Sequence, residues 1–144
     1  MAISPTPPQG IHHLAIQCHD MLGMVHFYEQ VLRLPVVRRW PDEDHHVARD
    51  RSVWMGVGAS FIALERVDDV AKPSPWRSPT PGMHLVALQI FPWNRQLWRD
   101  HLALHEVPIV LESQWTLYVR DPEGNRVGLS HFPDEEAASQ RTTW

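Results

Sequence analysis

One side chain of this sequence that could take part in chemistry is His13, in the stretch GIHHLAIQC (residues 10–18). An imidazole titrates near neutral pH, so His13 could act as a general base, ligate a metal ion or line a cavity as a hydrogen-bonding group. Should a metal ion bind, the candidates to join His13 are Glu65 and His84. Glu65 could instead form a salt bridge at the rim of a cavity, and His84 could lie at a strand edge with a backbone partner.

Other side chains could bind an organic ligand without a metal ion. Trp54 could stack on a flat ring, and Arg120 could hold a carboxylate or phosphate with two parallel hydrogen bonds. Tyr118 precedes Arg120 by two residues, which places both on one face if the segment is a strand. The full set of predicted ligand-binding residues is His13, Gln17, Trp54, Phe61, Glu65, Thr116, Tyr118 and Arg120.

The hydrophobic pattern of the first half predicts a strand, a helix and three more strands. Residues 10–18 alternate between apolar and polar side chains, which is typical of a strand. Asp20 is a suitable N-cap for the helix. The apolar stripe of this helix has the spacing i, i+3, i+4, i+7 and comprises Met24, Phe27, Tyr28 and Val31. Pro35 ends the helix, and short strands are expected within residues 35–40, 51–55 and 59–67.

The second half repeats this order of elements. A strand is expected at residues 83–90 and a helix at 92–106, with Pro92 near its start and one apolar stripe of Leu97, His101 and Leu104. Strands are then expected at residues 107–111, 115–121 and 125–132. The last two meet at the sequence DPEGN (121–125), where Pro122 and Gly124 favour a tight turn.

An internal repeat relates the two halves. GIHHLAIQC (10–18) matches GMHLVALQI (82–90) at an offset of 72, with Gly, His, Ala and Gln in register, while His13 corresponds to Leu85. We therefore expect a single α+β domain over residues 1–144 with two tandem βαβββ modules. Module one covers about 10–70, a proline-rich linker covers 71–82, and module two covers about 82–133.

Each expected sheet has one apolar face for its helix, formed by Leu14, Ile16, Ile62 and Leu64 in module one and by Val86, Leu88, Val127 and Leu129 in module two. The opposite faces carry small, aromatic and polar residues, including every predicted ligand-binding residue except Trp54, which is expected on the third strand. Such a mixture suits a ligand cavity better than a dry core.

The bulk composition narrows the function classes. The formal net charge is −4, from 13 Lys and Arg against 17 Asp and Glu, which gives no reason to expect nucleic acid or an acidic membrane surface as a partner. Cys18 is the single cysteine, so no intrachain disulfide and no cysteine-based zinc site can form. No stretch approaches the roughly 20 apolar residues that span a bilayer, and a cytoplasmic location is expected.

Two segments make the family recognisable. HLAIQCHDMLGMVHFYEQVLRLPVV (13–37) resembles the start of a module in the vicinal oxygen chelate superfamily, which includes glyoxalases, bleomycin-resistance proteins and ring-cleaving dioxygenases. WTLYVRDPEGNRVGLS (115–130) resembles its last hairpin, and the resemblance covers roughly residues 10–133. It implies curved mixed sheets that enclose a cavity, often in a homodimer.

The same resemblance implies where a metal ion would bind. In metal-binding members the ligands come from the first and last strand of each module, and here those positions are His13, Ala63, Leu85 and Gly128. Only the first can ligate through its side chain, whereas such sites need three or more donors. The sequence therefore departs from the metalloenzyme pattern, and no cofactor is expected.

Three functions fit these residues. The first is binding or sequestration of a small organic ligand, aromatic or antibiotic-like, by a cavity whose metal site has degenerated. The alternative is a metal-dependent lyase, isomerase or dioxygenase with non-standard ligands such as His13, Glu65 and His84. The third is a metal-free enzyme with His13 as its base. The expected partners are a small molecule and a second copy of the chain, with neither nucleic acid nor membrane.

Overall fold

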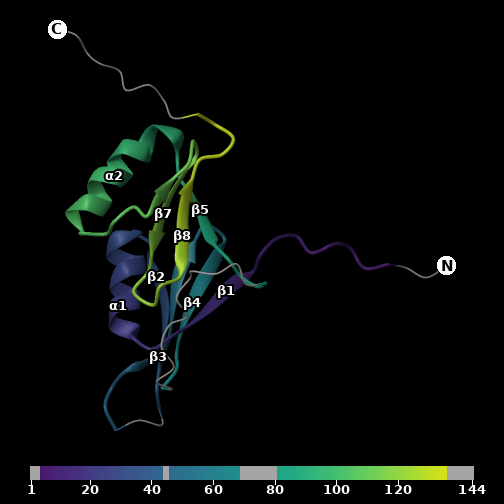
Figure 1. The fold of residues 1–144 in the computed structure, drawn as a ribbon. Helices are drawn as coiled ribbons and strands as arrows, with labels where there is room; N and C mark the ends of the chain where they lie inside the picture. The colour runs from purple at the N-terminus through teal and green to yellow at the C-terminus, as the bar shows by residue number, and fades with distance from the viewer. Residues whose placement is uncertain (1–3, 44–45, 69–80, 136–144) are drawn as a thin grey trace. The chain divides into compact units, whose positions relative to one another are not determined.

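The computed structural model describes residues 4–43, 46–68 and 81–135. The chain divides into two compact units, residues 1–70 and 71–144, and each unit consists of a strand, a helix and three further strands (Figure 1). The predicted α+β class with two βαβββ modules is confirmed. The expected linker, residues 71–82, lies outside the described residues except for its last two positions.

The first unit forms a four-stranded mixed sheet with one helix. Its elements are β1 (His13–Cys18), α1 (Met21–His26), the π-helical turn η1 (Phe27–Val31), β2 (Val36–Pro41), β3 (Asp50–Val57) and β4 (Ser60–Arg66). The strand order is β1-β4-β3-β2, with β1 parallel to β4 and the other pairs antiparallel. The parallel pair is possible because the helix supplies the crossover between the two edges of the sheet.

Local chemistry sets the start and the buried side of this helix. The Asp20 carboxylate accepts a hydrogen bond of 2.9 Å from the backbone N–H of Gly23, which confirms the predicted N-cap. The predicted apolar stripe is also confirmed, since Met24, Phe27, Tyr28 and Val31 are all buried. They share the core with Ile62 and Leu64 of β4 and with the apolar residues of β3. The face of the sheet that carries His13, Ala15 and Gln17 is left open; we call it the first open face.

The second unit repeats this topology. Its elements are β5 (Val86–Gln89), the 3-10 turn η2 (Pro92–Asn94), α2 (Arg95–Leu104), β6 (Leu111–Glu112), β7 (Thr116–Arg120) and β8 (Arg126–Ser130), in the sheet order β5-β8-β7-β6. β5 is parallel to β8, and the remaining pairs are antiparallel. The predicted turn at 121–125 is present: Gly124 has φ = 87°, and the buried Asp121 accepts hydrogen bonds from the backbone N–H groups of Glu123 and Asn125.

The orientation predicted for the second helix is wrong. Leu97 is 60% exposed and Leu104 is 79% exposed, whereas Arg95 and Leu102 are the buried residues of α2. The reason is that Arg95 forms hydrogen bonds with groups beneath the helix. A charged residue therefore lies on the buried side of the helix, and Leu97 and Leu104 lie on its exposed side. A hydrophobic pattern cannot signal a buried arginine.

No helix in the described part of the chain is long and apolar enough to cross a membrane.

Candidate functional site

Strand register gathers most of the predicted ligand-binding residues of the first module on the first open face. His13 of β1 lies opposite Phe61 of β4, and Gln17 lies opposite Glu65. Trp54 of β3 lies opposite Ala63. Ala63 is two residues from both Phe61 and Glu65 along β4, so all of these residues share one face. Because side chains alternate along a strand, His13, Gln17, Trp54, Phe61 and Glu65 all point away from the buried apolar face.

Aromatic rings form a continuous row across this face, from β1 to β2. His13 and Phe61 are stacked with 4.9 Å between ring centroids and an angle of 4°, and Phe61 and Trp54 are stacked at 4.3 Å and 18°. Trp40 of β2 follows at 5.7 Å from Trp54, tilted by 62°. We call His13, Phe61, Trp54 and Trp40 the aromatic row.

The spacing of the row follows from the sheet. Neighbouring strands lie about 4.8 Å apart, which matches the distance between stacked aromatic rings. Phe61 is therefore covered on both sides, by His13 and by Trp54. Beyond Trp54 the parallel stacking ends, because the ring of Trp40 is tilted against that of Trp54.

A broad pocket of about 830 Å³ lies at this end of the row. Trp40 and Trp54 form its aromatic side, and Gln17, Ser52 and Glu65 line it with polar groups. The indole N–H of Trp54 donates to the Ser52 hydroxyl at 3.2 Å, which fixes the ring. Arg38 stacks on Trp40, with its guanidinium carbon 3.8 Å from the ring centroid.

Sequence reasoning missed Trp40 and Arg38. Both lie on β2, whose pairing with β3 shifts register between Val36 and Arg38 and again between Trp40 and Pro41. A bulge changes which side chains reach a given face, so the alternation of the sequence alone could not assign Trp40 to the open face. The available signal was the high number of tryptophans, seven in the whole chain.

Besides stacking on Phe61, His13 contacts His12. Its Nδ1 lies 2.9 Å from Nδ1 of His12, and the two rings meet edge to face. One of these nitrogens must carry the proton and the other must accept it. The contact therefore requires that at least one of the two imidazoles is neutral.

His13 and Glu65, the two candidate metal ligands of the first unit, lie apart on its sheet. Glu65 is four residues beyond Phe61, the residue opposite His13, so the two positions are separated by about 13 Å along the sheet. His84 belongs to the other unit, where its Nε2 lies 3.3 Å from Nη1 of Arg126. Nowhere in residues 4–43, 46–68 and 81–135 do three or more His, Cys, Asp or Glu side chains gather closely enough to hold a metal ion.

The positions that the family resemblance assigns to metal ligands do not fit a divalent ion. In both units the last-strand position pairs with an alanine two residues after the first-strand position: Ala63 with Ala15, and Gly128 with Ala87. A Cβ added at Gly128 would meet the Thr116 methyl at 3.0 Å and Leu85 Cδ1 at 3.5 Å. Apolar atoms thus surround the ligand positions of the second unit, and His13 is the one side-chain donor among the four.

The remaining predicted residues lie on the corresponding open face of the second unit. Thr116, Tyr118 and Arg120 alternate along β7 and pair with Ser130, Gly128 and Arg126 of β8. Thr116 is buried and donates to the Ser130 hydroxyl at 2.9 Å. Tyr118 and Arg120 are half-buried, and Arg120 donates to the carbonyl of Gly124 at 3.1 Å.

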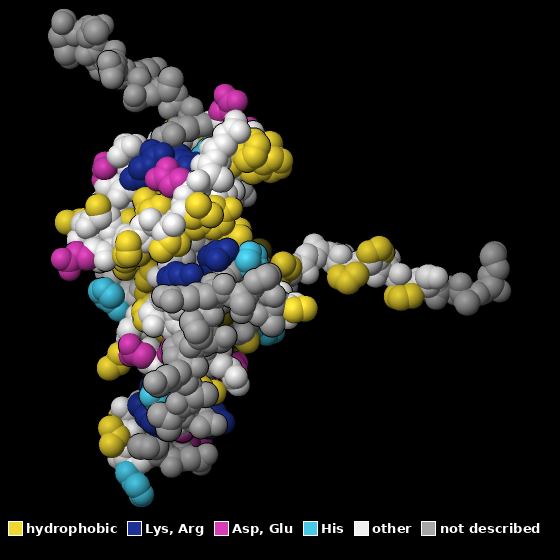
Figure 2. All heavy atoms as spheres, viewed as in Figure 1, with side chains coloured by type: hydrophobic (Ala, Val, Ile, Leu, Met, Phe, Trp, Pro, Cys, Tyr) yellow, Lys and Arg dark blue, Asp and Glu magenta, His cyan; other side chains and the backbone are white. Residues whose placement is uncertain are grey.

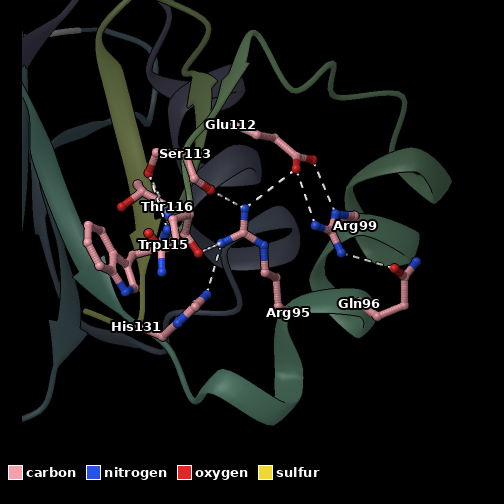
Figure 3. A network of polar contacts seen from close by, with 9 residues as sticks. Arg95, Gln96, Arg99, Glu112, Ser113, Trp115, Thr116 and His131 are labelled. Atoms are coloured by element: carbon pink, nitrogen blue, oxygen red, sulfur yellow. Dashed lines mark hydrogen bonds and ion pairs between the residues drawn. The ribbon is translucent and has the colours of Figure 1, made fainter. Parts of the chain in front are cut away.

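A buried arginine supports this second face from behind (Figure 3). Arg95 is 2% exposed and donates to the carbonyls of Ser113 and Gln114, at 2.7 and 3.2 Å. Its Nη1 also lies 2.9 Å from Nε2 of His131, a nitrogen that must accept because arginine only donates. Ser113 in turn accepts from the backbone N–H of Thr116 at 3.1 Å, so the network fixes the start of β7.

The outer end of the network is an ion pair with Glu112. Hydrogen bonds from Arg99, at 3.1 and 3.2 Å, are the main reason why the pKa of the Glu112 carboxyl lies below its ordinary value. Arg95 adds a longer contact of 3.5 Å. Glu112 therefore stays charged under mildly acidic conditions and links α2 to β6.

A second hollow, of about 660 Å³, lies beside α1 and includes Arg39, Arg49 and Asp50 in its lining. The charged groups of this lining form ion pairs. Arg39 pairs with Asp50, and Arg49 pairs with Asp42 and Asp68, which lie outside the lining. We interpret this region as a structural ion-pair network at the ends of β2 and β3.

The fold and the two open faces define a class of protein built from paired βαβββ modules. The model of the Glyoxalase/Bleomycin resistance protein/Dioxygenase superfamily matches residues 10–129. The chain therefore belongs to this superfamily. None of the curated protein sequences matches it significantly.

Solved structures share the fold at low sequence identity. A glyoxalase/dioxygenase from Nostoc punctiforme has a TM-score of 0.71 at 16% identity, covering 93% of this chain and 100% of that one. Lactoylglutathione lyase from Agrobacterium tumefaciens has 0.65 at 22%, covering 88% and 96%. The fosfomycin resistance protein FosX from Mesorhizobium loti has 0.64 at 14%, covering 86% and 92%. At these identities the likeness concerns the fold alone.

Proposed function

We propose that this protein binds a small organic molecule with a flat aromatic ring on the first open face, without a catalytic metal ion. The observation that carries the proposal is the aromatic row and the pocket at one of its ends. A flat ring in this pocket would contact the indoles of Trp54 and Trp40, which both line it. Stacked or edge-to-face rings attract one another beyond the effect of the buried area.

Polar side chains of the pocket would fix the orientation of the bound ligand. Gln17, Glu65 and Ser52 lie opposite one another on three adjacent strands, two residues along the strands from the pair of Trp54 and Ala63. The Glu65 side chain is exposed, and its carboxylate can accept hydrogen bonds from an N–H or O–H group on the ligand. A few such groups beside an apolar surface are typical of small-molecule sites.

Sequestration of an antibiotic-like compound is the role that we propose for this binding. The superfamily description includes bleomycin resistance proteins, and a fosfomycin resistance protein is among the structural neighbours. A sequestering protein needs affinity and no catalytic group, which agrees with a face of stacked rings and one histidine. A metal-dependent lyase, isomerase or dioxygenase would need donors that the described residues do not bring together.

The proposal is tested by thermal denaturation of the purified protein with indole, quinoline and 1-naphthol as probes. A ligand that binds only the folded state raises the melting temperature, and the rise grows with the ratio of ligand concentration to Kd. We expect at least one probe to raise the melting temperature of the wild type. Trp54→Leu should lose this shift, because the ring that the ligand stacks on is gone.

Trp93→Leu is the matched control. Trp93 is 63% exposed, stacks on Phe91 and belongs to the second unit, far from β3 in the sequence. This variant should keep the shift of the wild type. Equal shifts in the wild type and in Trp54→Leu, or no shift with any flat aromatic probe, would overturn the proposal.

A further inference from the structure

Glu65 places a carboxylate in the pocket at the end of the aromatic row. It lies on the first open face, with Gln17 opposite it on one neighbouring strand and Ser52 on the other. Within the part of the chain that the structure describes, no hydrogen bond or ion pair involves the Glu65 side chain. Glu43 adds a second negative charge to the lining. The charge of Glu65 is therefore available to a molecule bound in the pocket.

Both indoles of the pocket lie close enough to Glu65 to contact the same small ligand. Trp54 is opposite Ala63, two residues from Glu65 along β4, and such diagonal neighbours have Cβ atoms about 7 Å apart. Trp40 is opposite Ser52, so two strand spacings, about 10 Å, separate Trp40 from Glu65. A flat ring with a short side arm has the right length to touch an indole and the carboxylate together.

The tryptophan rings of the pocket also favour positive charge. The face of an indole attracts cations through its π electrons. Arg38 shows this attraction within the chain itself, because its guanidinium carbon lies 3.8 Å from the ring centroid of Trp40 and 5.9 Å from that of Trp54. Electron-rich rings and a carboxylate in one pocket are the combination that recognises an organic cation.

The arginines near the pocket have other contacts. Arg66 donates its Nε–H to the carbonyl of Asp50 at 2.9 Å, and Arg51 lies 3.9 Å from the Asp42 carboxylate. Both are one residue away from open-face positions, so their Cβ atoms point to the other side of the sheet. Arg38 shares the open face, but it is stacked on an indole and does not line the pocket. None of these three arginines forms an ion pair with Glu65.

We propose that the aromatic ligand of this pocket is a cation, a flat ring that carries a protonated amine, and that Glu65 selects its charge. Among the described residues visible in Figure 2, acidic and basic side chains both lie scattered, and neither kind forms a broad region in this view. The charge preference of the pocket is therefore a matter of individual groups such as Glu65. This inference rests on the proposed function, because Trp54 and Trp40 would bind the ring.

Isothermal titration calorimetry with three indole compounds of different charge tests the proposal. At neutral pH tryptamine is a cation, tryptophol has the same arm but is neutral, and indole-3-acetate is an anion. We expect the wild type to bind tryptamine about threefold to tenfold more tightly than tryptophol, and indole-3-acetate most weakly. Glu65→Gln should bind tryptamine and tryptophol alike, because it keeps the shape of the side chain and removes its charge. High salt should reduce the preference of the wild type, since Glu65 is exposed.

Two control variants separate selection by charge from binding of the ring. Glu29→Gln removes the same charge from η1, on the other side of the sheet, and should keep the wild-type preference. Trp54→Leu should weaken all three compounds, because it removes a ring surface that they share. Circular dichroism checks that the variants are folded.

The outcomes distinguish this inference from the proposed function. Equal binding of tryptamine and tryptophol by the wild type, tighter binding of indole-3-acetate, or an unchanged preference in Glu65→Gln would refute selection by Glu65 and leave the aromatic site standing. Failure of all three compounds to bind, or wild-type affinity for them in Trp54→Leu, would refute both proposals.

Discussion

Trp54 and His13 are the two residues of the first open face on which the proposed function depends. Trp54 is stacked on Phe61 and lines the pocket together with Trp40. His13 has its ring stacked on Phe61 and its Nδ1 in contact with His12, and the other family ligand positions carry Ala, Leu and Gly. The proposed function therefore depends on the identity of single residues within a shared fold.

The metal content of the purified protein tests this view of His13. Protein prepared without added metal should contain far less than one equivalent of Ni, Fe, Mn or Zn, because one imidazole does not make a metal site. Titration with these divalent ions should give the same weak binding for the wild type and for His13→Ala. Stoichiometric tight binding that disappears in His13→Ala would show that a metal centre exists.

For single residues, the sequence predicts the correct face of the sheet wherever the alternation along a regular strand is sufficient to assign it. His13, Gln17, Phe61 and Glu65 were assigned to one face, and the register of β1 and β4 places them there. Trp40 could not be assigned, because its face depends on bulges of β2. The contact of His84 with Arg126 could not be foreseen either, since β5 begins only at Val86 and the phase of the preceding residues is not set by a strand.

Among the elements, α2 shows most clearly what a sequence pattern cannot reveal. Its leucines at positions 97 and 104 suggest a core-facing stripe, yet the helix turns Arg95 inward, where two segments supply three acceptors. Those acceptors come from residues 113, 114 and 131, which are remote in sequence. In contrast, α1 follows its pattern because every residue of its stripe is apolar.

Replacing Arg95 by Met should strongly destabilise the protein. The substitution leaves the carbonyls of Ser113 and Gln114 and the Nε2 of His131 without this donor in a buried region, at a cost of about 3 kcal/mol. Arg99→Met, on the same helix, removes only partly exposed contacts and should cost less than about 1 kcal/mol. Urea denaturation measures both. Equal stability of the two variants would contradict the supporting role of Arg95.

The link between α2 and β6 should depend on pH through Glu112. Its pKa is lowered in the folded chain from an ordinary value of 4.5, so the charged form stabilises the fold above that pH. This contribution is lost as the pH falls through the lowered pKa. Its size should stay below about 1 kcal/mol, because the carboxylate is 41% exposed.

Urea denaturation at about pH 6 and about pH 3 measures this effect. Glu112→Gln should lose less stability than the wild type between the two pH values, because its side chain does not titrate. Arg99→Gln should show a similarly reduced loss, since it removes the donor that lowers the pKa of Glu112. An unchanged loss of stability in Glu112→Gln would rule out this contribution.

For the whole molecule, the internal repeat predicts the architecture more securely than the function. Both units share the strand order and the parallel pairing of their first and last strands, as the repeat between residues 10–18 and 82–90 indicates. The contents of the two open faces have diverged. Rings fill the first, whereas hydroxyl groups and arginines line the second. Membership in the superfamily fixes the scaffold, and these side chains distinguish this chain within it.

The most direct test of aromatic binding follows the indole N–H signals of the seven tryptophans by ¹H–¹⁵N NMR. The signals of Trp40 and Trp54 are assigned with the variants Trp40→Leu and Trp54→Leu, and that of Trp93 with Trp93→Leu. On titration with the probe that raises the melting temperature most, the Trp40 and Trp54 signals should shift and saturate together, because both indoles line the pocket that the ligand would occupy. The Trp93 signal should stay in place. Saturable shifts at Trp93 with unchanged Trp40 and Trp54 signals would contradict binding at the aromatic row.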